Sequence, residues 1–249
     1  MNLRSFLSHL TRHDKIVAKM NALLEKTDFI TKQQQELLMT QKYHDTIANY
    51  EWLKYKGISP GGWAVNYAFC YTLARTLNAM HPQSILECGL GQSSRIIHQY
   101  AAFYHVNAIT CEHDQTWIDF IKKEFGNNYP IEIWKTELEE IEFKGQKTLT
   151  YHNIQDIFKG KRFELILIDG PFGSPHYSRS QAIELCKNNL SDRFCVIIDD
   201  TERNGEKETI DEIKKVLTEK SVDFATTVYS STKSHTLLCS KDLFFLTSL

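Results

Sequence analysis

The first 55 residues carry the spacing of apolar positions that is typical of long helices. They contain no Gly or Pro and are dense in Lys, Gln, Glu and Leu. Apolar residues recur at steps of about three and four, at Ile16, Met20, Leu23, Ile30 and Leu37. Because Thr27 and Gln34 interrupt this seam, the pattern predicts a short coiled coil or a helix laid across a partner, and not a long zipper.

The helical pattern stops at residues 57–62, which read GISPGG. Adjacent glycines and a proline interrupt helices, so we expect a domain boundary here. Residues 1–55 are predicted to form an N-terminal helical extension, and residues 56–249 the main domain. The helices of the extension are a candidate contact for homo-oligomer formation.

Beyond residue 62, helical periodicity alternates with short apolar runs. The runs at 163–169 and 194–200 are continuous, as in strands that are buried on both faces of a parallel sheet. Further strands are expected at 84–88, 107–112 and 131–136, with a closing pair near 223–229 and 235–239. Strands separated by helices predict an α/β fold, with a Rossmann-like, doubly wound, mostly parallel seven-stranded sheet. Residues 137–147 are expected to form an exposed turn or hairpin.

Acidic residues stand at or just past the ends of four of these runs. They are Glu87, Glu112, Asp169 and the pair Asp199 and Asp200. In open α/β sheets, ligands bind outside the carboxyl ends of the strands. The four positions therefore predict one acidic crevice.

Composition excludes several classes of protein. The net charge of -2 gives no field that would favour a nucleic-acid backbone, so we expect no nucleic-acid partner. No stretch reaches the roughly 18 to 20 apolar residues of a membrane span. The six cysteines form no CxxC pair and lie in apolar contexts, which predicts buried thiols in a reducing cytoplasm.

The stretch ECGLGQSS, residues 87–94, predicts a glycine turn between a strand and a helix. Gly89 and Gly91 allow backbone angles and a close approach that a Cβ would forbid, and Ser93 or Ser94 can cap the helix. The spacing resembles the dinucleotide fingerprint, but Ser94 replaces its third glycine. A carboxylate at Glu87 would repel a pyrophosphate, whereas it can hold the α-ammonium of S-adenosylmethionine, which has no phosphate. Glu112 can accept hydrogen bonds from the ribose hydroxyls of either cofactor.

Four motifs together resemble the strand ends of class I S-adenosylmethionine-dependent methyltransferases. They are ILECGLGQSS, AITCEHD, LILIDGPFG and VIIDDTE, within about residues 60–240. IDGPFG followed by SRSQAIEL is similar to bacterial O-methyltransferases of glycan and polysaccharide biosynthesis, and more distantly to plant glucuronoxylan O-methyltransferases. Phe172 stands where this group usually has a second proline.

The resemblance implies roles for individual residues. Gly89, Gly91 and Glu87 would line the methionine moiety, with Ser93 and Ser94 completing that side. Glu112 would bind the ribose. The remaining positions are His113 and Asp114 near the adenine, Asp169 below the sulfonium, and Gly170 and Pro171 at the start of the acceptor loop.

Methyl transfer to a sugar hydroxyl requires a base within hydrogen-bond reach of the acceptor. Asp169 and His176 are the candidates, although Asp169 can equally serve only to orient the cofactor. Arg179 can bind an acidic acceptor with its guanidinium fork, or it can tie the loop to Glu184 or Asp200.

Asp169 with Asp200 also resembles the magnesium site of catechol-type O-methyltransferases. Because Thr201 replaces an amide ligand of that group, a divalent metal is not favoured. Trp52, Trp117 and Trp134 are assigned to packing. Trp63 either closes over the site or anchors packing.

The leading interpretation is a cytoplasmic S-adenosylmethionine-dependent O-methyltransferase that acts on a saccharide or glycan precursor. One alternative is an NAD-dependent oxidoreductase on the same fold, disfavoured by Glu87 and by the missing third glycine. The other is a non-catalytic, cofactor-binding scaffold protein that recruits partners through its N-terminal helices.

Overall fold

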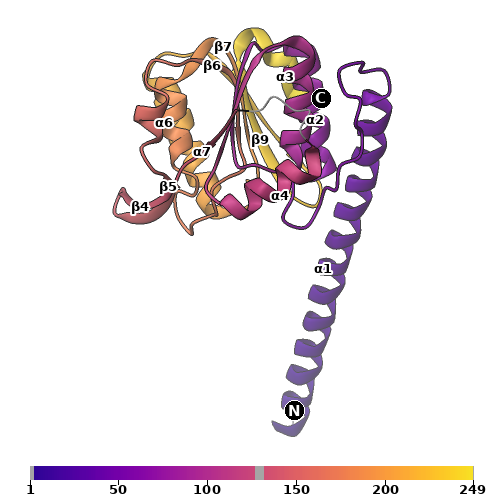
Figure 1. Ribbon diagram of the computed structural model, residues 1–249. Coiled ribbons are helices and arrows are strands. Elements are labelled where there is room, and N and C mark those ends of the chain that lie inside the picture. Colours follow the sequence, from indigo (N-terminus) through magenta and orange to yellow (C-terminus); the bar gives the residue numbers. More distant parts are fainter. Residues whose placement is uncertain (1–2, 127–131, 249) are drawn as a thin grey trace.

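The computed structural model describes residues 3–126 and 132–248, with side chains from residue 14 onward. A long N-terminal helix, α1 (Leu3–Ile47), runs away from an α/β body (Figure 1). Within the described ranges, no helix is both long and apolar enough to cross a membrane. All six cysteines are buried free thiols, as the sequence predicts.

Seven strands within the described residues form one twisted sheet. Their order is β3-β2-β1-β6-β7-β9-β8. The strands are β1 (Ser84–Cys88), β2 (Asn107–Glu112), β3 (Glu132–Lys135), β6 (Phe163–Ile168), β7 (Leu190–Ile198), β8 (Phe224–Ser230) and β9 (Ser234–Ser240). β3, β2, β1, β6 and β7 pair in parallel, and β9 runs antiparallel to both β7 and β8. The predicted mostly parallel, Rossmann-like sheet is confirmed.

Helices cover both faces of the sheet, which explains why its central strands are continuous apolar runs. α2 (Tyr67–Met80) and α3 (Gln92–Tyr104) pack on one face. The other face packs against α5 (Ile154–Ile157), α6 (Gln181–Asn188) and α7 (Asn204–Glu219). α4 (Gln115–Phe125) contributes Ile118 and Ile121 to a small cluster with Leu90, and a 3₁₀ helix, η1 (Lys241–Ser248), ends the described chain.

The end of the N-terminal extension belongs to the core of the body. Tyr43 and Ile47 of α1 are fully buried, and Trp52 and Leu53 pack in the same cluster as α2 and α3. Glu36 joins α1 to the body, because its carboxylate accepts hydrogen bonds from the backbone N–H of Tyr67 and from Ser231 Oγ, at 2.7 and 2.6 Å. The division at residues 55 and 56 stays a prediction.

The predicted hairpin after β3 is present. β4 (Leu138–Phe143) and β5 (Gln146–Tyr151) pair antiparallel around a turn at Lys144 and Gly145. Thr148 Oγ1 of β5 donates to the carbonyl of Tyr177, at 2.8 Å. The hairpin therefore stands outside the main sheet and contacts the loop that follows β6.

Candidate functional site: a cavity at the carboxyl ends of the strands

A cavity of about 550 Å³ opens where the parallel strands β1, β2, β6 and β7 end. The predicted acids Glu112, Asp169 and Asp200 line it together with the glycine turn. Segments far apart in the sequence form its walls, including the loop at residues 59–64 and Lys233 of the β8–β9 turn. Its size suits a small organic ligand, and its position agrees with the crevice predicted from the strand ends.

The backbone N–H groups of the glycine turn donate hydrogen bonds to acceptors within the protein. Gly89 N donates to the carbonyl of Cys111 at 3.0 Å, and Leu90 N to Glu112 Oε2 at 3.1 Å. Gly91 N, at the N-cap of α3, donates to Ser94 Oγ at 2.9 Å. Three successive amides are thus satisfied within the protein.

Glu87 lies beneath this turn, fully buried. Its carboxylate accepts hydrogen bonds from three hydroxyls, those of Ser93, Ser94 and Thr110, at 2.6, 2.7 and 2.9 Å. Burial raises the pKa of Glu87 from 4.5 to about 7, opposed by these hydroxyl donors. Glu87 is not among the residues that line the cavity. Its predicted direct contact with a ligand stays a prediction, and the geometry gives it the role of tying α3 to β1 and β2.

Glu112 ends β2 at the cavity wall. Its Oε1 accepts the backbone N–H groups of His113 and Asp114, at 2.6 and 3.0 Å, while Oε2 accepts that of Leu90. These bonds fix the carboxylate in the wall, and Oε2 keeps capacity for a further donor.

Aromatic side chains form another part of the wall. The rings of His113 and Phe172 meet edge to face, with centroids 5.2 Å apart, and both residues line the cavity. Trp117 Nε1 donates to the carbonyl of Leu90 at 2.6 Å. Trp117, for which the sequence predicts a packing role, also lines the cavity, and so does Trp63, a residue that is 93% exposed. An adenine ring or an acceptor could therefore meet apolar faces here.

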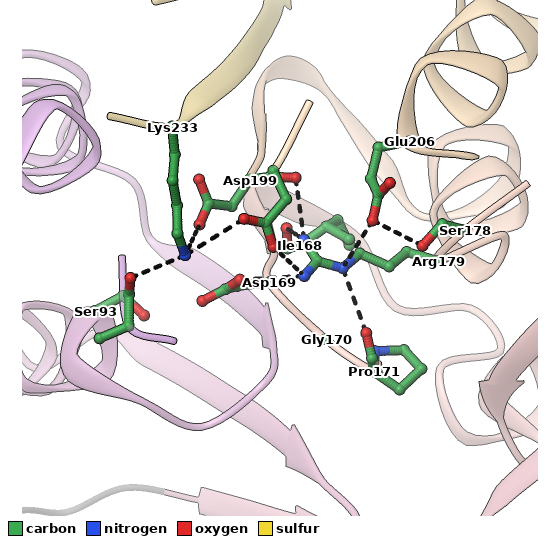
Figure 2. A network of polar contacts seen from close by, with 12 residues as sticks. Ser93, Ile168, Asp169, Gly170, Pro171, Ser178, Arg179, Asp199, Glu206 and Lys233 are labelled. Atoms are coloured by element: carbon green, nitrogen blue, oxygen red, sulfur yellow. Dashed lines mark hydrogen bonds and ion pairs between the residues drawn. The ribbon is translucent and has the colours of Figure 1, made fainter. Parts of the chain in front are cut away.

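Arg179 organises the acidic side of the cavity (Figure 2). The nearly buried guanidinium contacts Asp200 Oδ2 at 2.9 Å and Asp169 Oδ1 at 3.4 Å. It also donates to the carbonyls of Asp199 and Pro171, at 3.0 and 3.3 Å. Of the two roles predicted for Arg179, the structure contains the tie to Asp200.

Burial and like charges set the protonation of these acids. Burial raises the pKa of Asp169 from 3.8 to about 6, against the lowering effect of Arg179. Burial and the two neighbouring aspartates raise the pKa of Asp199 well above its ordinary value. Neither carboxylate oxygen of Asp199 has a hydrogen-bond partner in the part of the chain that the structure describes. Asp169 therefore reaches the cavity with a carboxyl pKa that burial raises to about 6.

Asp169, Asp199 and Asp200 bring carboxylate oxygens within 4.8 Å of one another. Three cations already face this cluster: besides Arg179, Lys233 Nζ lies 3.3 Å and Arg203 Nη1 3.1 Å from Asp200. These charges compensate the acids without a metal. The donor set is thus poorly suited to a divalent ion.

His176 lies on the surface and does not line the cavity. Its Nδ1 contacts Glu208 at 3.0 Å, at the start of α7. The structure therefore separates it from Asp169, Glu112 and the glycine turn. Its assignment as a base has no support in this geometry.

No protein-family model matches the chain, and no curated protein matches it at a significant level. Solved structures are similar at low identity. A Staphylococcus aureus protein described as a caffeoyl-CoA O-methyltransferase is 13% identical, with TM-score 0.49, over 85% of this chain and 99% of that one. A methyltransferase from Podospora anserina, solved with SAH bound, is 15% identical, with TM-score 0.49, over 82% and 88%. A Pyrococcus furiosus methyltransferase is 14% identical, with TM-score 0.45, over 85% and 98%.

Sequence reasoning did not single out Lys233 or Arg203 as cavity residues. Lys233 sits in the turn between two antiparallel strands, and Nζ donates to the carbonyl of Ala64 at 3.0 Å. Arg203 lies directly before α7 and pairs with Asp200. The acidic pair in VIIDD was the available signal, because buried carboxylates need cations nearby.

Proposed function

We propose that this protein is an S-adenosylmethionine-dependent methyltransferase. One observation carries the proposal: the backbone N–H groups of Gly89, Leu90 and Gly91 all donate hydrogen bonds to acceptors within the protein. In a dinucleotide site, the amides of this turn and the helix N-terminus face the pyrophosphate. Here the amides of the turn already donate to acceptors in the protein, and the carboxylate of Glu112 lies beside them. This arrangement favours a cofactor that has a ribose and a positive charge but no phosphate.

The residues of the cavity suit the parts of such a cofactor. Glu112 Oε2 can accept a hydrogen bond from a ribose hydroxyl, and His113, Phe172 and Trp117 offer faces and edges for an adenine. Asp169, which also lines the cavity, offers negative charge. When bound, S-adenosylmethionine supplies an activated methyl group on its sulfonium.

We assign the acceptor atom as a hydroxyl oxygen and the acceptor as a saccharide or glycan precursor. The resemblance of IDGPFG and SRSQAIEL to glycan O-methyltransferases supports this choice. A hydroxyl must lose its proton as it attacks, and Asp169 has both access to the cavity and a pKa of about 6. Arg179 acts as a positioning residue that holds Asp169 at the end of β6, and alignment of acceptor and methyl carbon supplies much of the rate gain.

The NAD-dependent oxidoreductase stays the second candidate. The burial of Glu87 removes one argument against it, since this carboxylate does not face the cavity. The hydrogen-bonded amides of the glycine turn supply a stronger argument against NAD.

The prediction of a reducing, cytoplasmic compartment is supported by the six buried thiols.

The test uses S-adenosylmethionine labelled on its methyl group and a panel of neutral and uronic-acid oligosaccharides. We expect the labelled methyl group on a saccharide oxygen, as a methyl ether. If the carboxylate is the base, Asp169→Asn should lower the rate by roughly 10²-fold or more. His176→Gln is the matched control and is expected to keep its rate. Cofactor binding without transfer to any oxygen acceptor would contradict the O-methyltransferase assignment.

A further inference from the structure

The exposed part of α1 carries an apolar stripe that the body of the protein does not cover. Figure 1 shows this part of the helix extending well beyond the body. Its large apolar side chains are 41% to 71% exposed. Those on the stripe are Ile16, Val17, Met20, Leu23, Leu24, Ile30, Leu37 and Leu38. We call this set the α1 stripe.

The α1 stripe repeats every seven residues. Apolar pairs occur at 16–17, 23–24 and 37–38, and Ile30 with Thr31 fills the remaining interval. Seven residues are nearly two helical turns, so positions seven apart share one face. Between the pairs lie Met20, Thr27 and Gln34. Thr27 and Gln34 interrupt a seam one residue wide, but they sit inside a stripe that is two residues wide.

A repeat of seven indicates what covers the stripe. Another helix that winds around α1 meets the same face at each interval of seven, whereas a flat surface demands no such period. From residue 16 to residue 38 the stripe spans 22 steps, or about 33 Å at the rise of an α-helix. Long helices that protrude into water also gain most of their stability from packing an apolar face.

Polar positions on the stripe favour an identical partner. Thr27 and Gln34 fall on the midline of the stripe, where polar side chains fix the register of paired helices at some expense of stability. The opposite face carries polar and charged residues, including Glu25 and Lys32, with the exposed Phe29 as an apolar exception. Lys32 pairs with Asp28 at 2.8 Å. A second copy supplies both the matching repeat and a matching polar midline.

We propose that two copies of this chain associate by pairing their α1 helices along the α1 stripe. Each stripe ends next to Glu36, which hydrogen-bonds the backbone of Tyr67 and the side chain of Ser231. The paired helices are therefore anchored directly to the body and do not hang from a flexible linker. The pairing is independent of the proposed reaction and can be tested without any acceptor.

The test is sedimentation equilibrium of the full chain at micromolar concentration. The wild-type protein is expected at twice the monomer mass of 29.0 kDa. Leu23→Lys with Ile30→Lys places charges on the stripe and should raise the dimer dissociation constant at least tenfold, since buried unpaired charges are costly. The control, Ala18→Lys with Glu25→Gln, adds the same two units of positive charge on the opposite face and should stay dimeric.

Two further measurements keep the result decisive. Circular dichroism establishes that each variant is folded, and Leu23→Gln with Ile30→Gln repeats the test without added charge. A monomeric wild type, or a stripe variant that stays fully dimeric, would overturn the proposal. Flotation of a monomeric wild type with phosphatidylserine vesicles, lost in the stripe variant, would assign the stripe to a membrane surface instead.

Discussion

Gly89 and Gly170 lie against each other, backbone to backbone, where the turns after β1 and β6 meet. A Cβ on Gly170 would stand 2.8 Å from Gly89 Cα and 2.6 Å from Tyr151 Oη. A Cβ on Gly89 would stand 2.8 Å from the carbonyl carbon of Asp169, and Gly89 also has φ of +102°. The close contact of these two turns places the backbone of Asp169 directly against the glycine turn.

Replacing Gly170 by alanine should therefore damage both stability and ligand binding. We expect Gly170→Ala to lower the free energy of unfolding by about 1–3 kcal/mol, as overpacking does, and to weaken cofactor binding. Gly57→Ala is the control, because no described atom lies within 4 Å of the added Cβ and its φ is not left-handed. Urea unfolding measures the difference, and equal stability of the two variants would show that the contact is looser than described.

The pH dependence of the reaction should report Asp169. Because the pKa of this carboxyl is raised to about 6, the base form is depleted below that pH. We expect kcat/KM to rise with pH and to reach half its limiting value near pH 6. Asp169→Asn should remove this limb together with most of the rate. A flat profile between pH 5 and pH 8 would exclude Asp169 as the base.

Glu87 should make stability fall as the solution becomes less acidic. Its pKa is raised from 4.5 to about 7, so the folded protein holds a proton that the unfolded chain releases. The contribution is complete below pH 4.5, declines as pH rises to about 7, and is lost above that, with a size of about 3 kcal/mol. Glu87→Gln should flatten this part of the profile, whereas Glu137→Gln, at an exposed position, should not. Parallel profiles for Glu87→Gln and wild type would contradict the buried position of Glu87.

Arg179 and His176 should differ sharply when replaced. Arg179→Ala leaves the buried carboxylates of Asp169 and Asp200 without their closest cation and should cost about 3–5 kcal/mol of stability. His176→Ala removes only a contact at the surface with Glu208 and should change stability by about 0.5 kcal/mol or less. Thermal unfolding compares the two, and a mild effect of Arg179→Ala would mean that Lys233 and Arg203 are sufficient to compensate the acids.

The sequence was sufficient to predict the sheet and the position of the crevice. Continuous apolar runs that end in acids indicate buried parallel strands, and the carboxyl ends of such strands converge by topology. Glu112 and Asp169 reach the cavity for this reason. Their positions at the cavity follow from the strand ends, which are local features of the chain.

The directions of other side chains could not be predicted. Glu87 precedes the end of β1 by one residue and points beneath the turn, toward Ser93, Ser94 and Thr110. This direction depends on the position of the first turn of α3, which contains Ser93 and Ser94. Lys233 reaches the cavity because β9 inserts between β7 and β8, a pairing that sequence spacing does not specify.

The most direct test of the account is isothermal titration of the purified full chain with S-adenosylhomocysteine and, separately, with NAD. We predict micromolar binding of S-adenosylhomocysteine, no binding of NAD, loss of binding in Glu112→Ala, and retention in the exposed control Glu124→Ala. Glu112 carries this prediction because its carboxylate is fixed in the cavity wall by the amides of Leu90, His113 and Asp114. Binding of NAD alone, or no binding of S-adenosylhomocysteine by folded protein, would contradict the methyltransferase assignment.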